Sequence, residues 1–428
     1  MDVVHPRVCG MDVSKTDAKV CVRTQQGTEV TREVTTWSAV SSQVLVLGEY
    51  LVAQQVTLVV MEATGDYWKP FYFLLSQCGL EVMLANARAV RQIPGRKTDV
   101  SDAQWLADLG AHGLVRGSFV PPAHVRVLRD LVRARTTLVR LRGQSAQRLE
   151  KVLESAGIKL SATISNLMGV TGRRMLAAMV AGQDDPAVLA QLADPRIQAS
   201  QDELREALTG RFTDHHQFLV EMHLDLIDGY TTKIEALEAR IDACFTGADD
   251  DPDPVRQAKA DLDQACTLLV TIPGIDTTTA QKILAETGAD MSVFPTAKNL
   301  TSWAGVAPGA NQSAGKTRST KCPKGDTYLK GALGIAVKAV VKSEDTFFAA
   351  RFARVRSRRG YKAAVVALER SMLVAVWTVL TTGKPYVDPG GDYYARRKPG
   401  KAIAKGVSML RAAGMNVTFT STDAVVVT

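Results

Sequence analysis

The sequence of 428 residues lacks the marks of a secreted or membrane protein. Its six cysteines lie far apart and form no C-x-x-C pair, which argues against a disulfide framework and against a structural zinc site. No run of about 18 apolar residues occurs, and the N-terminus lacks the basic-then-apolar layout of a signal peptide. We therefore expect a soluble, cytoplasmic protein with buried free thiols and no membrane partner.

Acidic residues are scarce in the last third of the chain. From Lys298 to the C-terminus there are 22 Lys and Arg against 7 Asp and Glu, a net charge of +15, while residues 1–297 carry 30 against 37, a net of −7. This distribution is typical of a polyanion-binding module joined to a larger scaffold. The alternative is a basic surface that serves solubility alone.

The first 120 residues indicate an α/β domain. Alternating apolar residues predict a β-hairpin over 8–13 and 18–22, with a third short strand over 28–34. Helix, strand, helix and strand follow over 39–51, 56–61, 68–78 and 80–84, and a further helix begins near Asp99. Three antiparallel strands followed by these alternating elements are the order of the RNase H-like fold.

The rest of the chain reads as mostly helical. Segment 125–153 and a second long segment up to Cys244 carry apolar residues at helical spacing, and the second has a coiled-coil-like seam. That seam packs either within the chain or between subunits. An acidic linker at 247–254 leads to helices over 327–342 and 361–380, with a Gly/Ser/Lys loop at 308–326 before them.

Four carboxylates occupy suggestive positions in the N-terminal region. Asp12 lies in the first strand and Glu62 directly follows the fourth, and these strands are neighbours in an RNase H-like order. Asp99 and Asp102 are spaced to share one face of a helical turn. Mg²⁺, with Mn²⁺ as a substitute, would relieve the repulsion among such groups because it prefers carboxylate oxygens.

A competing interpretation concerns the same hairpin. Residues 12–16 also resemble the first phosphate loop of actin-like ATPases and sugar kinases. Those folds need a second phosphate loop and a Gly-Gly adenosine motif downstream, and we find neither in a suitable context. Taken singly, each of the acids is more often a cap or turn residue than a ligand.

Two C-terminal segments are candidates for phosphate binding. The IPGI sequence at 272–275 resembles a helix-hairpin-helix turn, in which Gly274 would let backbone N–H groups approach a phosphate; a simple helix-start turn is the alternative. In the loop that follows, the open Ser313 is surrounded by basic residues. Spacing alone favours a phosphate-binding loop over a serine nucleophile there. The basic residues are Lys316, Arg318, Lys321 and Lys324.

A basic cluster with interleaved aromatic residues follows at 347–362. It suits contacts with a nucleic-acid backbone and some base stacking, while a solvated helix face is the alternative. The candidate contacts are Arg351, Arg354 and Arg358, and the aromatic residues are Phe347, Phe348, Phe352 and Tyr361.

Seven motifs in a fixed order resemble one family over roughly residues 7–400: the IS-one-ten family of RuvC-like, DEDD-type insertion-sequence transposases. The N-terminal motifs are GMDVSK at 10–15, MEATG at 61–65 and KTDVSDA at 97–103. The C-terminal motifs are IPGI at 272–275, WAGVAP at 303–308, QSAGK at 312–316 and KGDTYLK at 324–330. Family members often have two serines where this chain has Gln312 and Ser313.

The resemblance implies a catalytic machinery. Asp12, Glu62, Asp99 and Asp102 would bind Mg²⁺, and Ser313 would attack a DNA phosphodiester and hold a covalent phosphoserine link. The serine of one protomer would complete the carboxylate site of another in a dimer or tetramer. A structured guide RNA, the bridge RNA, would pair with donor and target DNA in a prokaryotic, nucleoid-associated setting.

The overall expectation is an RNA-guided DNA recombinase with four regions. A metal-dependent Holliday-junction-type nuclease and a non-catalytic nucleic-acid-binding protein are the alternatives. The regions are an RNase H-like (RuvC-like) domain at 1–120, a helical, coiled-coil middle at 121–250, a mostly α serine-bearing domain at 251–400 and a tail at 401–428.

Overall fold

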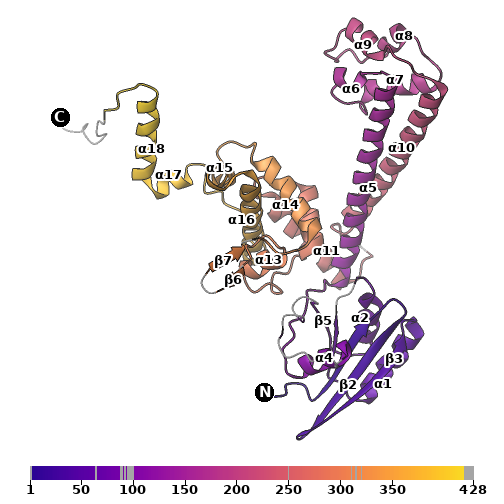
Figure 1. Cartoon of the computed structure of the whole chain (residues 1–428), viewed down its shortest axis with the longest axis vertical. Helices are drawn as coiled ribbons and strands as arrows, with labels where there is room; N and C mark the ends of the chain where they lie inside the picture. Colours follow the sequence, from indigo (N-terminus) through magenta and orange to yellow (C-terminus); the bar gives the residue numbers. More distant parts are fainter. Residues whose placement is uncertain are drawn as a thin grey trace. The chain divides into compact units, whose positions relative to one another are not determined.

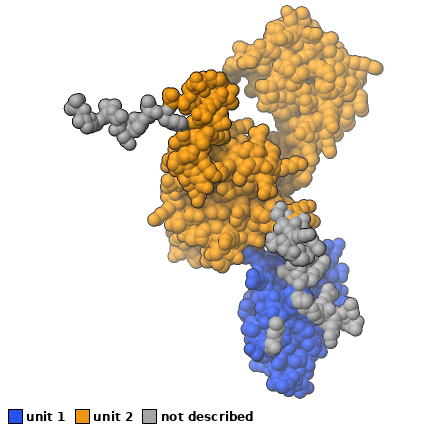
Figure 2. All heavy atoms as spheres, turned by 60° about the vertical axis from the view of Figure 1, so that its left-hand side comes forward, with its two compact units in different colours: residues 1–120 blue, residues 121–428 orange. Residues whose placement is uncertain are grey.

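The computed structural model describes residues 2–62, 65–86, 90, 93, 101–248, 250–309, 311–313, 316–319 and 321–418, with the backbone alone for 311–313 and 316–318. The chain divides into two compact units, unit 1 with residues 1–120 and unit 2 with residues 121–428 (Figure 2). The division into four regions stays a prediction.

Unit 1 is built on a five-stranded mixed sheet. The strands lie in the order β3-β2-β1-β4-β5, with β2 antiparallel to both neighbours and β1, β4 and β5 parallel. This arrangement confirms the expected antiparallel strands and is compatible with an RNase H-like fold. The elements are β1 (Arg7–Val13), β2 (Asp17–Gln26), β3 (Glu29–Ser38), α1 (Ser41–Ala53), β4 (Leu58–Glu62), α2 (Trp68–Gln77), β5 (Val82–Ala85) and α4 (Asp102–Ala111).

The two faces of this sheet bury alternate residues of each strand. Cys9 and Met11 of β1 belong to the core cluster that includes side chains of α1 and α2. Val8 of β1 and Val60 of β4 belong to the opposite cluster, under α4. Residues of the same parity as Val8 and Val60 therefore face α4.

Helix α4 packs unusually close to β1. A Cβ on Gly10 would lie 2.0 Å from the backbone oxygen of Ala103, so only glycine fits there. Small residues on both surfaces let the helix backbone approach the sheet. The far end of the helix is held by Asp108, which accepts hydrogen bonds from Arg23 of β2 at 3.0 Å and Arg32 of β3 at 2.8 Å.

Unit 2 begins with a long antiparallel helical pair, α5 (Ala123–Ser155) and α10 (Asp214–Asp242), which lie side by side (Figure 1). Arg142 contacts Thr231 and Arg135 contacts Glu238, which fixes the antiparallel direction. The seam expected on the second helix therefore packs within the chain. The segment of chain that connects α5 to α10 forms four short helices at one end of the pair (Figure 1). They are α6 (Leu160–Thr163), α7 (Val170–Val180), α8 (Pro186–Ala190) and α9 (Gln201–Leu208).

The remainder of unit 2 is helical apart from one small hairpin. The helices predicted over 327–342 and 361–380 are confirmed, whereas the expected loop at 308–326 contains two short paired strands. The elements are α11 (Asp253–Val270), α12 (Thr277–Thr287), α13 (Ala297–Trp303), β6 (Asn311–Ser313), β7 (Lys316–Ser319), α14 (Thr327–Val340), α15 (Phe347–Arg359), α16 (Tyr361–Thr382), α17 (Tyr393–Arg397) and α18 (Pro399–Ala412).

Among the described residues, α16 alone is long and apolar enough to cross a membrane by length and composition. The sequence prediction of no long apolar run overlooked it, because Glu369 and Arg370 interrupt the segment. The helix packs against α11, α13, α14 and α15, and side chains such as Leu368 and Met372 are fully buried. These contacts are those of a core helix.

Candidate functional site

Two of the candidate acids of unit 1, Asp12 and Glu62, lie on the α4 face of the sheet. Asp12 follows Met11, which pairs in register with Met61, so Asp12 and Glu62 occupy the ends of adjacent parallel strands. Their parity matches Val8 and Val60, which places both on the side covered by α4. Asp102, Asp12 and Glu62 are all half-buried. The alternation of apolar residues in the two strands is therefore sufficient to bring Asp12 and Glu62 to the same face and the same end of the sheet.

Asp102 is the first residue of α4. The Ser101 side chain accepts a hydrogen bond from the Gln104 N–H at 3.3 Å, and the Gln104 side chain accepts one from the Ser101 N–H at 3.0 Å. This capping box fixes where the helix begins. The helix predicted to begin near Asp99 is present and begins three positions later, at Asp102, because Ser101 is extended and caps it. Asp99 itself lies outside the described residues.

The surroundings of Asp12 disfavour its charged form. Burial raises the pKa of the Asp12 carboxyl, and the negative charge of Asp102 raises it further. Lys19, its cross-strand partner on β2, acts in the opposite direction. Sequence reasoning missed Lys19, although its place in the hairpin register could have revealed it.

The donor set of this edge suits a hard divalent cation in part. Carboxylate oxygens are the ligands that Mg²⁺ and Mn²⁺ prefer, and a cation would relieve the repulsion between Asp12 and Asp102. Among the residues that the structure describes, however, no three His, Cys, Asp or Glu side chains are grouped closely enough to hold a metal ion. The four-carboxylate set therefore stays a prediction.

Ser313 lies at the end of a two-stranded hairpin in unit 2. It is the last residue of β6, and the backbone register pairs it with Lys316, the first residue of β7. The base of the hairpin is narrow, since a Cβ on Gly309 would lie 2.6 Å from the backbone oxygen of Lys321 and one on Gly325 would lie 2.2 Å from that of Ala304. Ser313 and Lys316 thus belong to a paired turn rather than to an open loop.

The other basic residues of this segment lie along the same hairpin. Arg318 belongs to β7, while Lys321 and Lys324 follow it and are exposed. The exposed ammonium groups of Lys321 and Lys324 suit a phosphate backbone, although an exposed basic residue is also common where nothing binds. Their role as phosphate contacts stays a prediction.

Gly274 lies in the turn between α11 and α12. Its φ is +87°, and a Cβ there would lie 2.6 Å from the backbone oxygen of Ala336 and 2.8 Å from the Cβ of Val340. The close approach of α14 is therefore sufficient to require a glycine at this position. Because packing already explains the glycine, its presence is no evidence for phosphate binding. Phosphate binding by this turn stays a prediction.

The basic cluster of the sequence forms helix α15. Arg358 is exposed, whereas Arg351 donates to the Tyr394 hydroxyl at 3.3 Å and Arg354 lies over the Tyr394 ring at 4.7 Å. Phe348 and Phe352 are 1% and 3% exposed. These two rings are core residues, so the prediction that they stack on bases is wrong.

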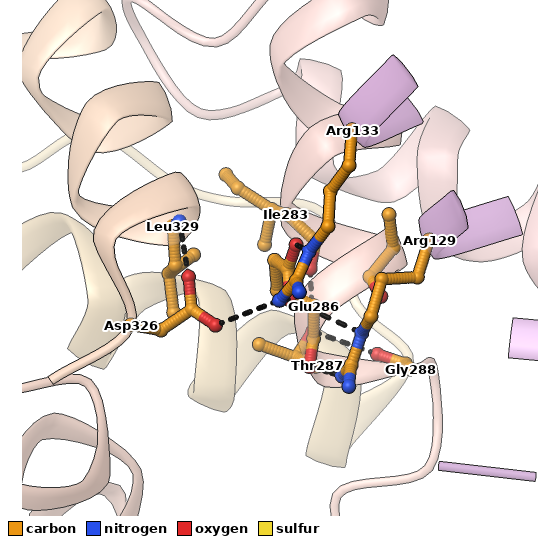
Figure 3. A network of polar contacts seen from close by, with 9 residues as sticks. Arg129, Arg133, Ile283, Glu286, Thr287, Gly288, Asp326 and Leu329 are labelled. Atoms are coloured by element: carbon orange, nitrogen blue, oxygen red, sulfur yellow. Dashed lines mark hydrogen bonds and ion pairs between the residues drawn. The ribbon is translucent and has the colours of Figure 1, made fainter. Parts of the chain in front are cut away.

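A buried polar network that the sequence did not predict joins α5 to α12 and α14 (Figure 3). Glu286, only 1% exposed, accepts two hydrogen bonds from Arg133, at 2.8 and 2.7 Å. Arg129 donates to the backbone oxygens of Ala285 at 2.9 Å and Glu286 at 2.6 Å. These contacts span 153 to 157 positions of sequence, which is why no local pattern reveals them.

The same network reaches the helix that follows the Ser313 hairpin. Asp326 accepts a hydrogen bond from Arg133 at 3.3 Å and caps α14 by accepting from the Leu329 N–H at 2.8 Å. Burial lowers the pKa of the Arg133 guanidinium, but the hydrogen bond and charge of Glu286 outweigh it and raise the pKa overall. The KGD motif of the sequence therefore contains a helix cap that is hydrogen-bonded to an arginine of α5.

Two family models match the chain, over two separate ranges of residues. One, described as a DEDD transposase, matches residues 9–158, and the other, described as the transposase IS116/IS110/IS902 family, matches residues 266–352. No curated protein matches the chain. Both models describe transposases, enzymes that cleave and recombine DNA, and a DEDD domain suggests dependence on a divalent metal.

The chain belongs to the IS110 family of insertion-sequence transposases, which is the IS-one-ten family of the sequence resemblance. The first matched range contains Asp12, Glu62, Asp99 and Asp102, and the second contains Gly274 and Ser313.

Proposed function

We propose that this transposase exchanges DNA strands through a phosphoserine intermediate on Ser313, with Asp12, Glu62, Asp99 and Asp102 as the ligands of Mg²⁺. The observation that carries the proposal is that Asp12 lies on the α4 face beside the end of β4, close enough to Asp102 for the charge of Asp102 to raise its pKa. Such a surplus of negative charge favours a bound cation.

The chemistry conserves the number of phosphoester bonds. The Ser313 oxygen attacks phosphorus, a serine–phosphate bond forms, and one ester bond of the DNA breaks to leave a strand with a free hydroxyl group, which receives the serine proton. A hydroxyl of the partner strand then attacks the phosphoserine and releases Ser313. No ATP or water is consumed, which agrees with the absence of a second phosphate loop in the sequence. A bound Mg²⁺ would supply charge neutralisation for the phosphate oxygens.

The direct test is strand exchange on matched donor and target DNA with Mg²⁺ and the RNA of the element. Wild type should give a protein–DNA adduct that resists denaturant, and Ser313→Ala and Asp12→Ala should each abolish it. Ser319→Ala in the same hairpin and Asp17→Asn beside Asp12 are matched controls that should retain the adduct. Hydrolytic cleavage without an adduct, persisting in Ser313→Ala, would instead establish a metal-dependent nuclease.

Two further parts of the proposal need separate experiments: the guide RNA, and the completion of the carboxylate site of one protomer by Ser313 of another. Omission of the RNA should remove target selection, because base pairing supplies the sequence specificity. Mixing Ser313→Ala protein with Asp12→Ala protein should restore part of the activity if the serine of one protomer completes the carboxylate site of another. Failure of the mixture, with each wild-type control active, would place both groups within one protomer.

A further inference from the structure

A pocket of about 380 Å³ opens between α5, α12 and α14 of unit 2. Its wall is mostly apolar, with Val132, Ala332 and Ile335 among the lining residues. Two cationic side chains, Arg140 from α5 and Lys282 from α12, line the same pocket. Glu286 also lines the pocket, but its carboxylate is held by Arg133. An apolar wall with two cations suits an anionic ligand that has an apolar or aromatic part.

The two cations have no protein partner in the described part of the chain. Neither the Lys282 ammonium nor the Arg140 guanidinium makes a hydrogen bond or an ion pair there, whereas Arg133 and Arg135 on the same helix are both paired. Burial lowers the pKa of Lys282 and the nearby charge of Arg135 lowers it further, while the charge of Asp276 acts in the opposite direction. The half-buried Lys282 ammonium therefore has no hydrogen bond or ion pair in the described part of the chain and can donate to a phosphate oxygen of a ligand.

An aromatic platform lies beside these cations. Tyr328 lines the pocket and remains 39% exposed, while Arg133, which does not line the pocket, lies over its ring at 4.5 Å. Glu286 and Asp326 hold Arg133 in place through the network of Figure 3. The ring is thus supported from one side by a fixed guanidinium, which restricts its rotation and leaves another side to the pocket.

We propose that this pocket binds a single unstacked nucleotide of a nucleic-acid strand, with its phosphate on Lys282 and Arg140 and its base on Tyr328. Stacking of bases on aromatic rings beside basic residues is the usual way in which proteins hold single strands. The site is separate from Ser313 and from the carboxylates of unit 1, and it requires only that the chain bind nucleic acid.

The test measures binding without strand chemistry, in a Ser313→Ala background with a chelator present. A short single-stranded DNA carrying 2-aminopurine at one position reports both affinity and stacking. Tyr328→Leu should lose the quenching of 2-aminopurine and weaken binding about tenfold, while Tyr328→Phe should keep both. Lys282→Met and Arg140→Ala should each lower the slope of log affinity against log salt by about one.

Lys338→Ala, an exposed lysine of α14 outside the pocket, is the matched control and should bind as the parent protein does. An RNA of the same sequence identifies which strand supplies the nucleotide, since the strand with the Tyr328-dependent quenching is the occupant. Quenching that survives Tyr328→Leu, salt slopes unchanged in Lys282→Met and Arg140→Ala, or binding of duplex alone would each overturn the proposal. Melting temperatures of the variants verify that the fold is intact.

Discussion

The carboxylates of the two units have opposite surroundings. Glu286 of unit 2 is almost fully buried and is paired with two arginines, and Asp326 beside it shares one of them. Asp12 of unit 1 is half-buried, and the charges of Asp102 and Asp17 raise its pKa. Of the groups that shift its pKa, Lys19 is the one that lowers it. Burial raises the pKa of both carboxyls, but at Glu286 the guanidinium groups of Arg129 and Arg133 act against that shift, whereas at Asp12 the charge of Asp102 adds to it.

The largest effect on stability should come from removing the paired acid. Glu286→Gln removes the buried carboxylate that Arg129 and Arg133 share, and Arg133 keeps only Asp326 as its counter-charge. This change should lower the free energy of unfolding by about 3 kcal/mol. Glu238→Gln, which removes the partly exposed partner of Arg135, should cost at most about 1 kcal/mol. Denaturant titration of the full chain measures both, and equal losses would contradict the distinction.

The next effect concerns the packing that brings Asp102 to Asp12. Gly10→Ala would place a Cβ 2.0 Å from one backbone atom of α4 and 2.4 Å from another, so the helix must move away at a cost of about 1–3 kcal/mol. Gly143→Ala, on an open side of α5, should instead stabilise the chain by about 1 kcal/mol. Thermal unfolding of the two variants should therefore give shifts of opposite sign.

Loss of a helix cap should have a smaller effect on stability and a selective one on activity. Ser101→Ala removes the cap that positions Asp102 and should cost about 1 kcal/mol. Ser200→Ala removes the same kind of capping box from α9 of unit 2 and should cost a similar amount. Strand exchange should fall only in Ser101→Ala, and a parallel loss in both variants would assign the effect to stability.

The smallest shift should be a gain. The pKa of Asp12 is higher in the folded than in the unfolded chain, so the free energy of unfolding falls as the pH rises from the unfolded pKa through the folded pKa. Asp12→Asn removes this loss, and the melting temperature at neutral pH without metal should rise by a few degrees while activity is lost. Asp326→Asn should lower it. Melting curves across the acid range test the sign.

Strand alternation and helical periodicity predicted much of the fold. The hairpin of β1 and β2, the long helices α5 and α10, and the shared face of Asp12 and Glu62 all follow from the spacing of apolar residues. The start of α4 was missed although the signal was present, since Ser101 and Gln104 have the spacing of a capping box. The β6–β7 hairpin was missed because its strands are short and rich in small polar residues.

Contacts between distant segments could not be predicted in this way. Nothing near Glu286 in the sequence shows that two arginines of α5 meet it, and Phe348 looks like Tyr361 until the packing of α15 buries the first ring and leaves the second 52% exposed. The place of Lys19 opposite Asp12 was available from the hairpin register but needed the register to be fixed first. These are properties of tertiary packing rather than of local pattern.

The contact between Gly10 and α4 also bears on how a copy of this insertion sequence loses its activity through mutation. Every other amino acid carries a Cβ, so any missense change at this codon displaces the helix that carries Asp102 while leaving all the acids in place. Under the proposed mechanism, a copy that keeps the four carboxylates and Ser313 is therefore inert once Asp102 has moved away from Asp12. A genomic survey that counts active copies by those five residues alone would then overestimate how many copies can still transpose.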